Sequence, residues 1–148
     1  MDTLIAENAF LTLFFLSFLA ATLIPLGSEW LLVFLVARQY DPLASVLIAT
    51  AGNTLGACTT YAVGLYGGPW LTENLLRIDT ATRQRAEMYY CRYGYWSLLL
   101  SWLPFIGDPI CLVGGVFRVG FLRFIVLVAN GKMFRYAAVA WLTLKATT

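Results

Sequence analysis

The fold is decided by the stretch NAFLTLFFLSFLAATLIPLGSEWLLVFLVA, which covers residues 8–37. An apolar run reaches Ile24, the break Pro25-Leu26-Gly27-Ser28-Glu29 follows, and a second apolar run covers Trp30–Ala37. Eight residues of helix rise only about 12 Å, whereas the hydrocarbon core of a bilayer is about 30 Å thick. The second run is therefore too short to cross a membrane. We interpret the stretch as a re-entrant hairpin, whose two arms enter from one side and meet at the Pro/Gly tip.

The composition supports a membrane location. Of the 148 residues, 60% are hydrophobic and 12% are charged, and the mean hydropathy is +0.75. Average soluble domains contain roughly 45–50% apolar and about 25% charged residues. The formal net charge of +2 is too small to indicate a nucleic-acid partner. The sequence therefore predicts an integral membrane protein.

The residue types argue against catalysis. The chain has no histidine, which excludes His-based general bases, His metal ligands and Ser-His or Cys-His pairs. The three cysteines, Cys58, Cys91 and Cys111, form no C-x-x-C pair and no even-numbered disulfide framework. We expect no metal, no cofactor and no enzymatic activity.

Two further segments complete the first part of the chain. Leu43–Tyr66 carries no charge and is long enough to span a bilayer, and Gly67-Gly68-Pro69 is expected to end it. The polar stretch Thr72–Arg92 follows and predicts a surface helix that begins near Thr80. It is either a solvated connector between two membrane halves or a helix lying on the lipid headgroups.

The second part repeats the order of the first. Tyr95–Leu103 is apolar, the segment Pro104–Pro109 breaks it, Ile110–Phe117 is a second short run, and Ile125–Leu144 is a long one. A shift of 79 positions places Pro25 on Pro104, Glu29 on Asp108 and Gly52 on Gly131.

The expected fold is therefore all-α, with two halves that each combine a re-entrant hairpin and a spanning helix. The first half covers about residues 8–68, the connector 69–94 and the second half about 95–145. Each half crosses the membrane an odd number of times, so the halves must insert in opposite senses, which is the inverted-repeat plan of many secondary transporters. A plain four-helix bundle with proline kinks is the alternative.

Four charges lie within the apolar segments and are the candidate substrate- or proton-binding residues: Glu29, Asp108, Lys132 and Arg135. Charges at membrane depth are costly and usually face a protein interior or a wet cavity. Lys132 and Arg135 are three residues apart and share a helix face, so we expect them to pair with the two carboxylates. Two alternatives stay open: the carboxylates cap the second hairpin arms, and the cations snorkel to the interface.

Other residues are expected to shape the tips of the hairpins. These tip residues are Pro25, Gly27, Ser28, Pro104, Gly107 and Pro109. Asn53 and Asn130 are candidates for hydrogen bonds to a tip, one in each half. Gly52-x-x-x-Gly56 is typical of close helix packing.

Three blocks of sequence resemble the DedA family, also called VTT-domain or SNARE-associated-like membrane proteins, and within it the small YqaA-type branch. The first block is Leu23–Glu29. The second is Gly52-Asn53-Thr54-Leu55-Gly56 with Tyr61, Gly64 and Gly67 after it. The third runs from Arg92-Tyr93-Gly94 through Ser101–Asp108 to Gly114-Gly115 and Gly131–Tyr136. Together they cover roughly residues 20–140.

The resemblance implies facing re-entrant hairpins, a bacterial inner-membrane location and a role in moving or maintaining phospholipids or polyprenyl-phosphate carriers. It also implies a functional acidic residue in the first hairpin, which Glu29 matches. The family's arginine in the second hairpin is absent, because Asp108 follows Gly107 here, and Lys132 and Arg135 are candidates to replace it.

The function expected is thus a lipid or lipid-phosphate flippase, scramblase or proton-coupled transporter. The expected partners are membrane lipids or a lipid-phosphate carrier, with protons and a second copy of the chain as further candidates. A small proton-coupled exporter of organic cations and a non-catalytic membrane assembly or homeostasis factor remain as alternatives.

Overall fold

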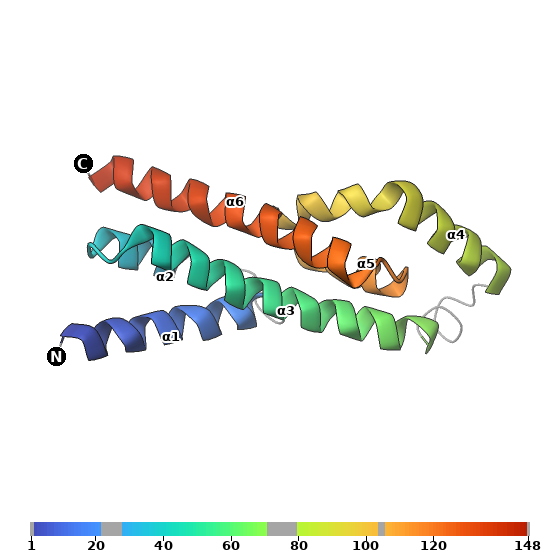
Figure 1. Cartoon of the computed structure of the whole chain (residues 1–148), viewed down its shortest axis with the longest axis horizontal. Coiled ribbons are helices and arrows are strands. Elements are labelled where there is room, and N and C mark those ends of the chain that lie inside the picture. The colour runs from blue at the N-terminus through green and yellow to red at the C-terminus, as the bar shows by residue number, and fades with distance from the viewer. Residues whose placement is uncertain (1, 22–27, 71–79, 104–105, 148) are drawn as a thin grey trace. The chain divides into compact units, whose positions relative to one another are not determined.

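The computed structural model describes residues 2–21, 28–70, 80–103 and 106–147, and all regular structure in these ranges is helical. Figure 1 shows the helices in chain order along the colour bar. Their bounds are α1 Asp2–Ala20, α2 Ser28–Ala37, α3 Pro42–Trp70, α4 Thr80–Tyr93, the 3₁₀ helix η2 Gly94–Trp102, α5 Gly107–Val116 and α6 Phe121–Thr147. The expected all-α class is therefore confirmed.

Of the described helices, two are long and apolar enough to cross a bilayer. They cover Pro42–Gly68 and Phe121–Thr147, 27 residues each, and such a length of helix rises about 40 Å. Only 28% of the apolar window in α6 is buried, and α6 exposes large apolar side chains such as Leu122 and Phe134. That exposure suits contact with lipid better than contact with water.

The glycines and proline at 67–69 do not stop α3, which continues to Trp70. The expected helix end was wrong because these glycines are compatible with helix and one of them is needed for packing. A Cβ built on Gly68 would lie 3.1 Å from the Cα of Val116 in α5. A glycine here permits the close approach of two helices.

The chain divides into two compact units, each with its own core. Unit 1 comprises Met1–Gly56 and Lys132–Thr148, and unit 2 comprises Ala57–Gly131. Unit 1 thus contains α1, α2, the first part of α3 and the last part of α6, and unit 2 contains the last part of α3, α4, η2, α5 and the first part of α6.

The core of unit 1 draws on all four of its helices. It is formed by Leu13, Leu32, Leu35, Val36, Val46, Ala49, Tyr136 and Ala140. Glycines bring α3 close to α1: a Cβ on Gly52 would collide with the carbonyl oxygen of Phe14, and one on Gly56 would collide with that of Phe18. The predicted packing role of this glycine pair is therefore supported by the geometry of the backbone.

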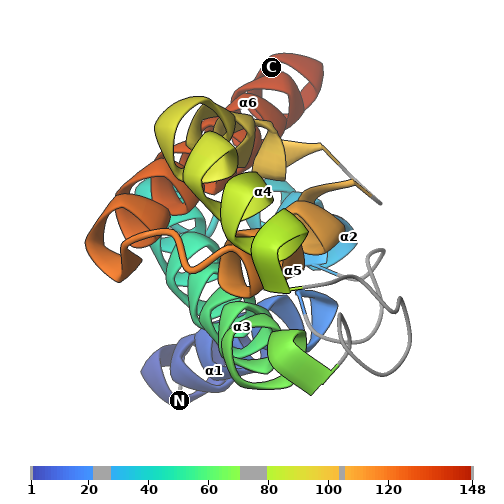
Figure 2. The ribbon, with the colours of Figure 1, turned by 90° about the vertical axis from the view of Figure 1, so that its right-hand side faces the viewer.

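Unit 2 is viewed in Figure 2 from the side of α4, α5 and the end of α3. Its core is formed by Ala57, Tyr61, Leu98, Cys111, Val119, Phe124 and Val128. Here η2 packs against α4 and α5, and the hydroxyl of Tyr61 donates to the carbonyl of Val119 at 2.5 Å.

The 79-residue repeat recurs in the helix boundaries. The bounds of α2 and α5 are each 79 positions apart, as are the first residues of α3 and α6. Both short helices end in the same way, with a left-handed residue: Gln39 has φ 64° and Arg118 has φ 51°. In both helices the backbone amide of the next residue donates to the carbonyl oxygen five residues earlier: Tyr40 donates to Leu35, and Val119 donates to Gly114. These bonds are the C-terminal capping pattern that left-handed residues permit.

The last residues of the two expected breaks, Pro25–Glu29 and Pro104–Pro109, are helical. Glu29 lies in the first turn of α2 and Asp108 in the first turn of α5. A carboxylate is favoured there, because the first amides of a helix have no partner within the helix and the N-terminus is electropositive. Pro25, Gly27 and Pro104 lie outside the described residues.

Candidate functional site

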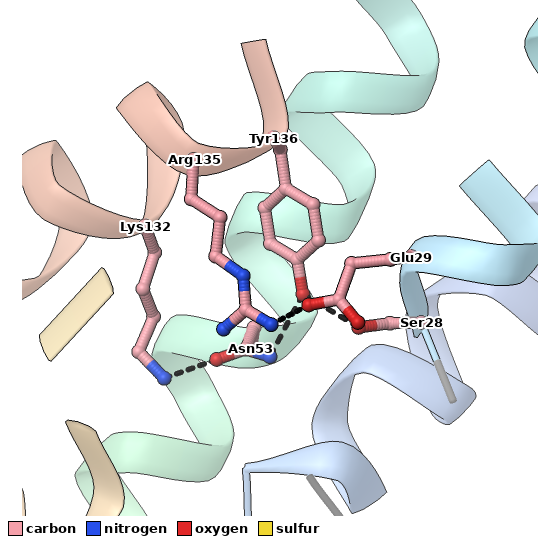
Figure 3. Close-up of polar contacts among 6 residues, drawn as sticks. All are labelled: Ser28, Glu29, Asn53, Lys132, Arg135 and Tyr136. Carbon is pink, nitrogen blue, oxygen red and sulfur yellow. Dashed lines mark hydrogen bonds and ion pairs between the residues drawn. The ribbon is translucent and has the colours of Figure 1, made fainter. Parts of the chain in front are cut away.

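Three polar side chains of α6 point toward α2 and α3 within unit 1 (Figure 3). Lys132, Arg135 and Tyr136 are spaced at i, i+3 and i+4, so the helix presents them on one face. Ser28 and Glu29 of α2 and Asn53 of α3 complete the group. We call these six residues the polar cluster.

An ion pair joins Glu29 to Arg135. The two side chains are 22% and 20% exposed, so the pair is neither sealed in the core nor fully open. Its position in the first turn of α2 adds the helix N-terminus to the charges that stabilise the carboxylate. The structure therefore joins two of the charges that the sequence singled out.

Lys132 is more deeply placed than Arg135. Only 4% of Lys132 is exposed, and its ammonium donates a hydrogen bond to Oδ1 of Asn53, itself 7% exposed. An amide oxygen satisfies an ammonium donor without neutralising its charge. Asn53 was expected to hydrogen-bond to a hairpin tip, whereas the contact here joins α3 to a cation of α6.

Tyr136 connects this contact to α2. Nδ2 of Asn53 donates to the Tyr136 hydroxyl at 2.8 Å, and that hydroxyl lies 2.8 Å from Oγ of Ser28. Because the hydroxyl accepts from Asn53, its own hydrogen is available for Ser28. Tyr136 is 1% exposed and Ser28 is 2% exposed. A continuous chain of hydrogen bonds therefore runs from Lys132 through Asn53 and Tyr136 to Ser28.

The sequence alone did not assign a role to Tyr136. Tyrosines are abundant in this chain and are ordinary residues of membrane interfaces, so its type carried no signal. Its spacing of four residues from Lys132 was the available clue, since it places both side chains on one helix face.

The remaining described residues among the predicted site residues belong to unit 2. Asp108 is half-buried in the first turn of α5, in unit 2. Gly107 is buried there, and a Cβ on it would collide with the carbonyl oxygen of Ser101; Pro109 is exposed. Asn130 is exposed and donates to the carbonyl of Val126 in its own helix at 2.6 Å, not to a tip.

The described residues hold no group of three or more His, Cys, Asp or Glu side chains that could ligate a metal ion. The chemistry available to the polar cluster is accordingly that of two cations, a carboxylate and neutral hydrogen-bonding groups. Such a set can bind an anion and exchange a proton.

A family model for the VTT domain matches residues 24–143, which include every member of the polar cluster. The chain belongs to the VTT-domain, or DedA, family. The resemblance drawn from the motifs is thereby confirmed.

Curated relatives of this VTT-domain protein extend over nearly its whole length. An inner membrane protein, YqaA, of Escherichia coli is 38% identical over 135 residues, covering 90% of each chain, and the protein of that name in Shigella flexneri matches equally. An uncharacterized protein of Haemophilus influenzae is 36% identical over 144 residues, covering 92% of this chain and 88% of the relative. No solved structure matches.

These findings establish the location. This VTT-domain protein is an integral membrane protein of the inner membrane, as its two long apolar helices and its relatives indicate.

Proposed function

We propose that this protein moves a lipid or a lipid-linked phosphate across the membrane, as a flippase, scramblase or proton-coupled transporter, without acting as an enzyme. The observation that carries the proposal is the partly exposed ion pair between Glu29 and Arg135. Charges within apolar segments are expensive, and those that persist usually belong to substrate or proton pathways.

The ion pair allows Arg135 to exchange Glu29 for the phosphate of a substrate. Protonation of Glu29 would remove the charge that holds Arg135. An arginine freed in this way can bind a phosphate through two parallel N–H···O bonds. Lys132, which donates to Asn53, carries a second positive charge within the polar cluster.

The hydrogen-bond chain links this exchange to the position of α2. Ser28 precedes Glu29, and Tyr136 follows Arg135, so the ion pair and the Tyr136–Ser28 bond join the same two helices. Release of the ion pair would therefore loosen α2 from α6 and favour another arrangement of the first hairpin. A small preference of the substrate for one arrangement is enough to shift the balance between them.

An inverted repeat of two re-entrant hairpins is the architecture we propose for this cycle. The matching bounds of α2 and α5 and their matching C-terminal caps support it. Asn53 and Lys132, which are hydrogen-bonded, are themselves 79 positions apart. A residue that contacts its own repeat counterpart is expected near a two-fold axis, where the binding sites of such transporters lie.

The test is a lipid-translocation assay with purified protein in proteoliposomes. A panel of lipids with different headgroups is measured at two pH values, for the wild type, Glu29→Gln and Arg135→Gln. Glu87→Gln is the matched control, since Glu87 lies in α4, outside the long apolar helices. Each variant is first checked for insertion and monodispersity.

We expect Glu29→Gln to remove the pH dependence of translocation. Both cluster variants should slow translocation about tenfold or more, because each loses a charge-assisted contact worth roughly 1.5–3 kcal/mol. Glu87→Gln should behave as the wild type. Unchanged translocation and unchanged pH dependence in Glu29→Gln would overturn the proposal and favour an assembly or homeostasis factor. Transport of organic cations is disfavoured by the two cations of the polar cluster.

A further inference from the structure

Unit 2 carries an open groove of about 310 Å³ between η2 and the first turns of α6. The residues that line it are Tyr95, Trp96, Leu122, Arg123, Val126 and Leu127. Its volume falls at the lower end of the range for small-ligand sites, roughly 300–1,000 Å³. Arg123 is the charged member of an otherwise apolar and aromatic lining.

The groove is flanked by exposed apolar side chains. Leu122 is 77% exposed, Trp96 56% and Val126 51%, and Leu122 and Val126 belong to a helix that is long and apolar enough to span the membrane. Arg123 is the third residue of that helix, so its guanidinium lies near one end of the span. Tyrosine and tryptophan are enriched at this depth, where headgroups meet the hydrocarbon.

An anionic partner would stabilise the charge of Arg123. The N-terminus of a helix is electropositive, and a cation in its first turn is unfavourable unless a negative group offsets it. The guanidinium lies over the ring of Tyr95, 5.8 Å from its centroid. Within the part of the chain that the structure describes, no carboxylate forms an ion pair with it.

We propose that this groove binds one anionic phospholipid, with its phosphate on Arg123 and an acyl chain along Leu122, Val126 and Leu127. The membrane supplies such a ligand at the depth of the groove, and the positive charge beside an apolar channel matches an amphiphile with an anionic head. The site is separate from the polar cluster, which belongs to unit 1. Its lipid is a bound component of unit 2 and does not depend on the proposed transport.

The test is native mass spectrometry of the full-length protein in detergent, titrated in separate experiments with dioleoylphosphatidylglycerol and dioleoylphosphatidylcholine. Arg123→Gln removes the phosphate contact. Arg118→Gln is the matched control: it removes the same charge from an exposed position outside the lining. Glutamine suits the left-handed backbone there, since Gln39 has that conformation at the repeat counterpart. Val126→Trp fills the apolar part of the groove.

We expect one phosphatidylglycerol to bind the wild type roughly fivefold or more tightly than phosphatidylcholine. Both lipids carry a phosphate, but the choline ammonium offsets its charge, whereas phosphatidylglycerol keeps a net negative charge for Arg123. Arg123→Gln should lose this preference, Arg118→Gln should keep it, and Val126→Trp should weaken the binding of both lipids.

An equal loss of the phosphatidylglycerol preference in Arg123→Gln and Arg118→Gln would overturn the proposal, since it would indicate attraction by the net charge of the protein alone. The proposal also fails if phosphatidylcholine binds as tightly as phosphatidylglycerol, or if Val126→Trp binds both lipids as the wild type does. Circular dichroism and gel filtration check folding. If Arg123→Gln is not monodisperse, the lipid preference of the wild type and the Val126→Trp result decide the question.

Discussion

At the scale of single residues, the hydroxyl of the buried Tyr136 joins two other buried polar groups. It accepts from Asn53 and contacts Ser28, and both of those groups are buried. A buried polar group that loses its partner keeps its desolvation cost without the compensating bond. The hydrogen bonds that join Asn53 and Ser28 to Tyr136 therefore depend on one oxygen atom.

Tyr136→Phe keeps the ring and removes that oxygen. We expect it to lower the free energy of unfolding by about 1–3 kcal/mol, because Asn53 and Ser28 each lose a buried hydrogen bond. Equilibrium unfolding in mixed detergent micelles measures this. Tyr89→Phe is the control, since Tyr89 is 70% exposed on α4; equal effects of the two substitutions would contradict the network.

Cys91 provides a prediction about pH in the connector helix α4. Burial raises the pKa of the Cys91 thiol, nearby Glu87 raises it further, and Arg123 opposes the change. The thiol also donates to the carbonyl of Phe117. The reactive thiolate is therefore scarcer than in an unfolded chain at the same pH.

Alkylation of Cys91 by iodoacetamide, followed by peptide mass spectrometry, should rise at higher pH in the folded protein than in the unfolded one. Glu87→Gln should move the rise toward lower pH. Because the folded-state pKa is the higher one, the protonated thiol contributes stability below the unfolded-state pKa, and this is lost as pH rises through the folded-state value. A folded-state profile at or below the unfolded one would refute the burial argument.

At the scale of helices, the contact between α1 and α3 rests on backbone approach. A Cβ on Gly52 would meet the carbonyl oxygen of Phe14, which cannot rotate aside as a side chain can. Gly67 in the same helix has nothing within 4 Å of its added Cβ. The two glycines therefore form a matched pair for substitution.

Gly52→Ala should destabilise the protein by about 1–3 kcal/mol, the usual range for overpacking. Gly67→Ala should be neutral or stabilising by up to about 1 kcal/mol, since alanine is the better helix former. Thermal unfolding of both variants in detergent measures the difference. Equal melting temperatures would show that α1 does not pack closely on α3.

The sequence predicted some helix ends better than others. The end of α2 at Ala37 matched the end of its apolar run, because Arg38-Gln39-Tyr40-Asp41-Pro42 changes polarity abruptly. The start of α2 came two residues before the predicted Trp30, since the helix includes Glu29 in its first turn. The end of α3 was missed, because periodicity within one segment carries no information about Val116, the distant residue on which Gly68 packs.

At the scale of the whole molecule, the charges of the candidate site could be found from the sequence but their partners could not. Lys132 and Arg135 stand out in an apolar helix. Which of them pairs with Glu29 depends on the non-local packing of α2 on α6, and α6 places Arg135 beside Glu29 and Lys132 beside Asn53. The order of the repeats was visible in the sequence, whereas the split of α3 and α6 between two cores was not.

Membrane orientation follows from the distribution of basic residues. The connector, the turn after α5 and the first turn of α6 contain Arg77, Arg83, Arg85, Arg92, Arg118 and Arg123, whereas the turn after α2 and the end of α6 contain only Arg38 and Lys145. The positive-inside rule therefore predicts a cytoplasmic connector and outward-facing termini.

Gln84→Cys and Ala146→Cys test this orientation, as both positions are exposed. In intact cells, an impermeant maleimide should label the cysteine at 146 and spare the one at 84, and permeabilised cells should lose the difference. The reverse labelling pattern would mean that the chain inserts the other way round.

The hydrogen bond between Asn53 and Lys132 has an evolutionary consequence. If the two halves descend from one duplicated segment, both positions began with the same amino acid. Two lysines in contact would repel each other, whereas two asparagines would hydrogen-bond, so a paired ancestor is expected to have carried asparagine at both. The lysine could be acquired only after the copies were encoded separately, since a mutation then changed one side alone. Gene duplication would thus have been the step that allowed a buried cation to enter a symmetric, neutral contact.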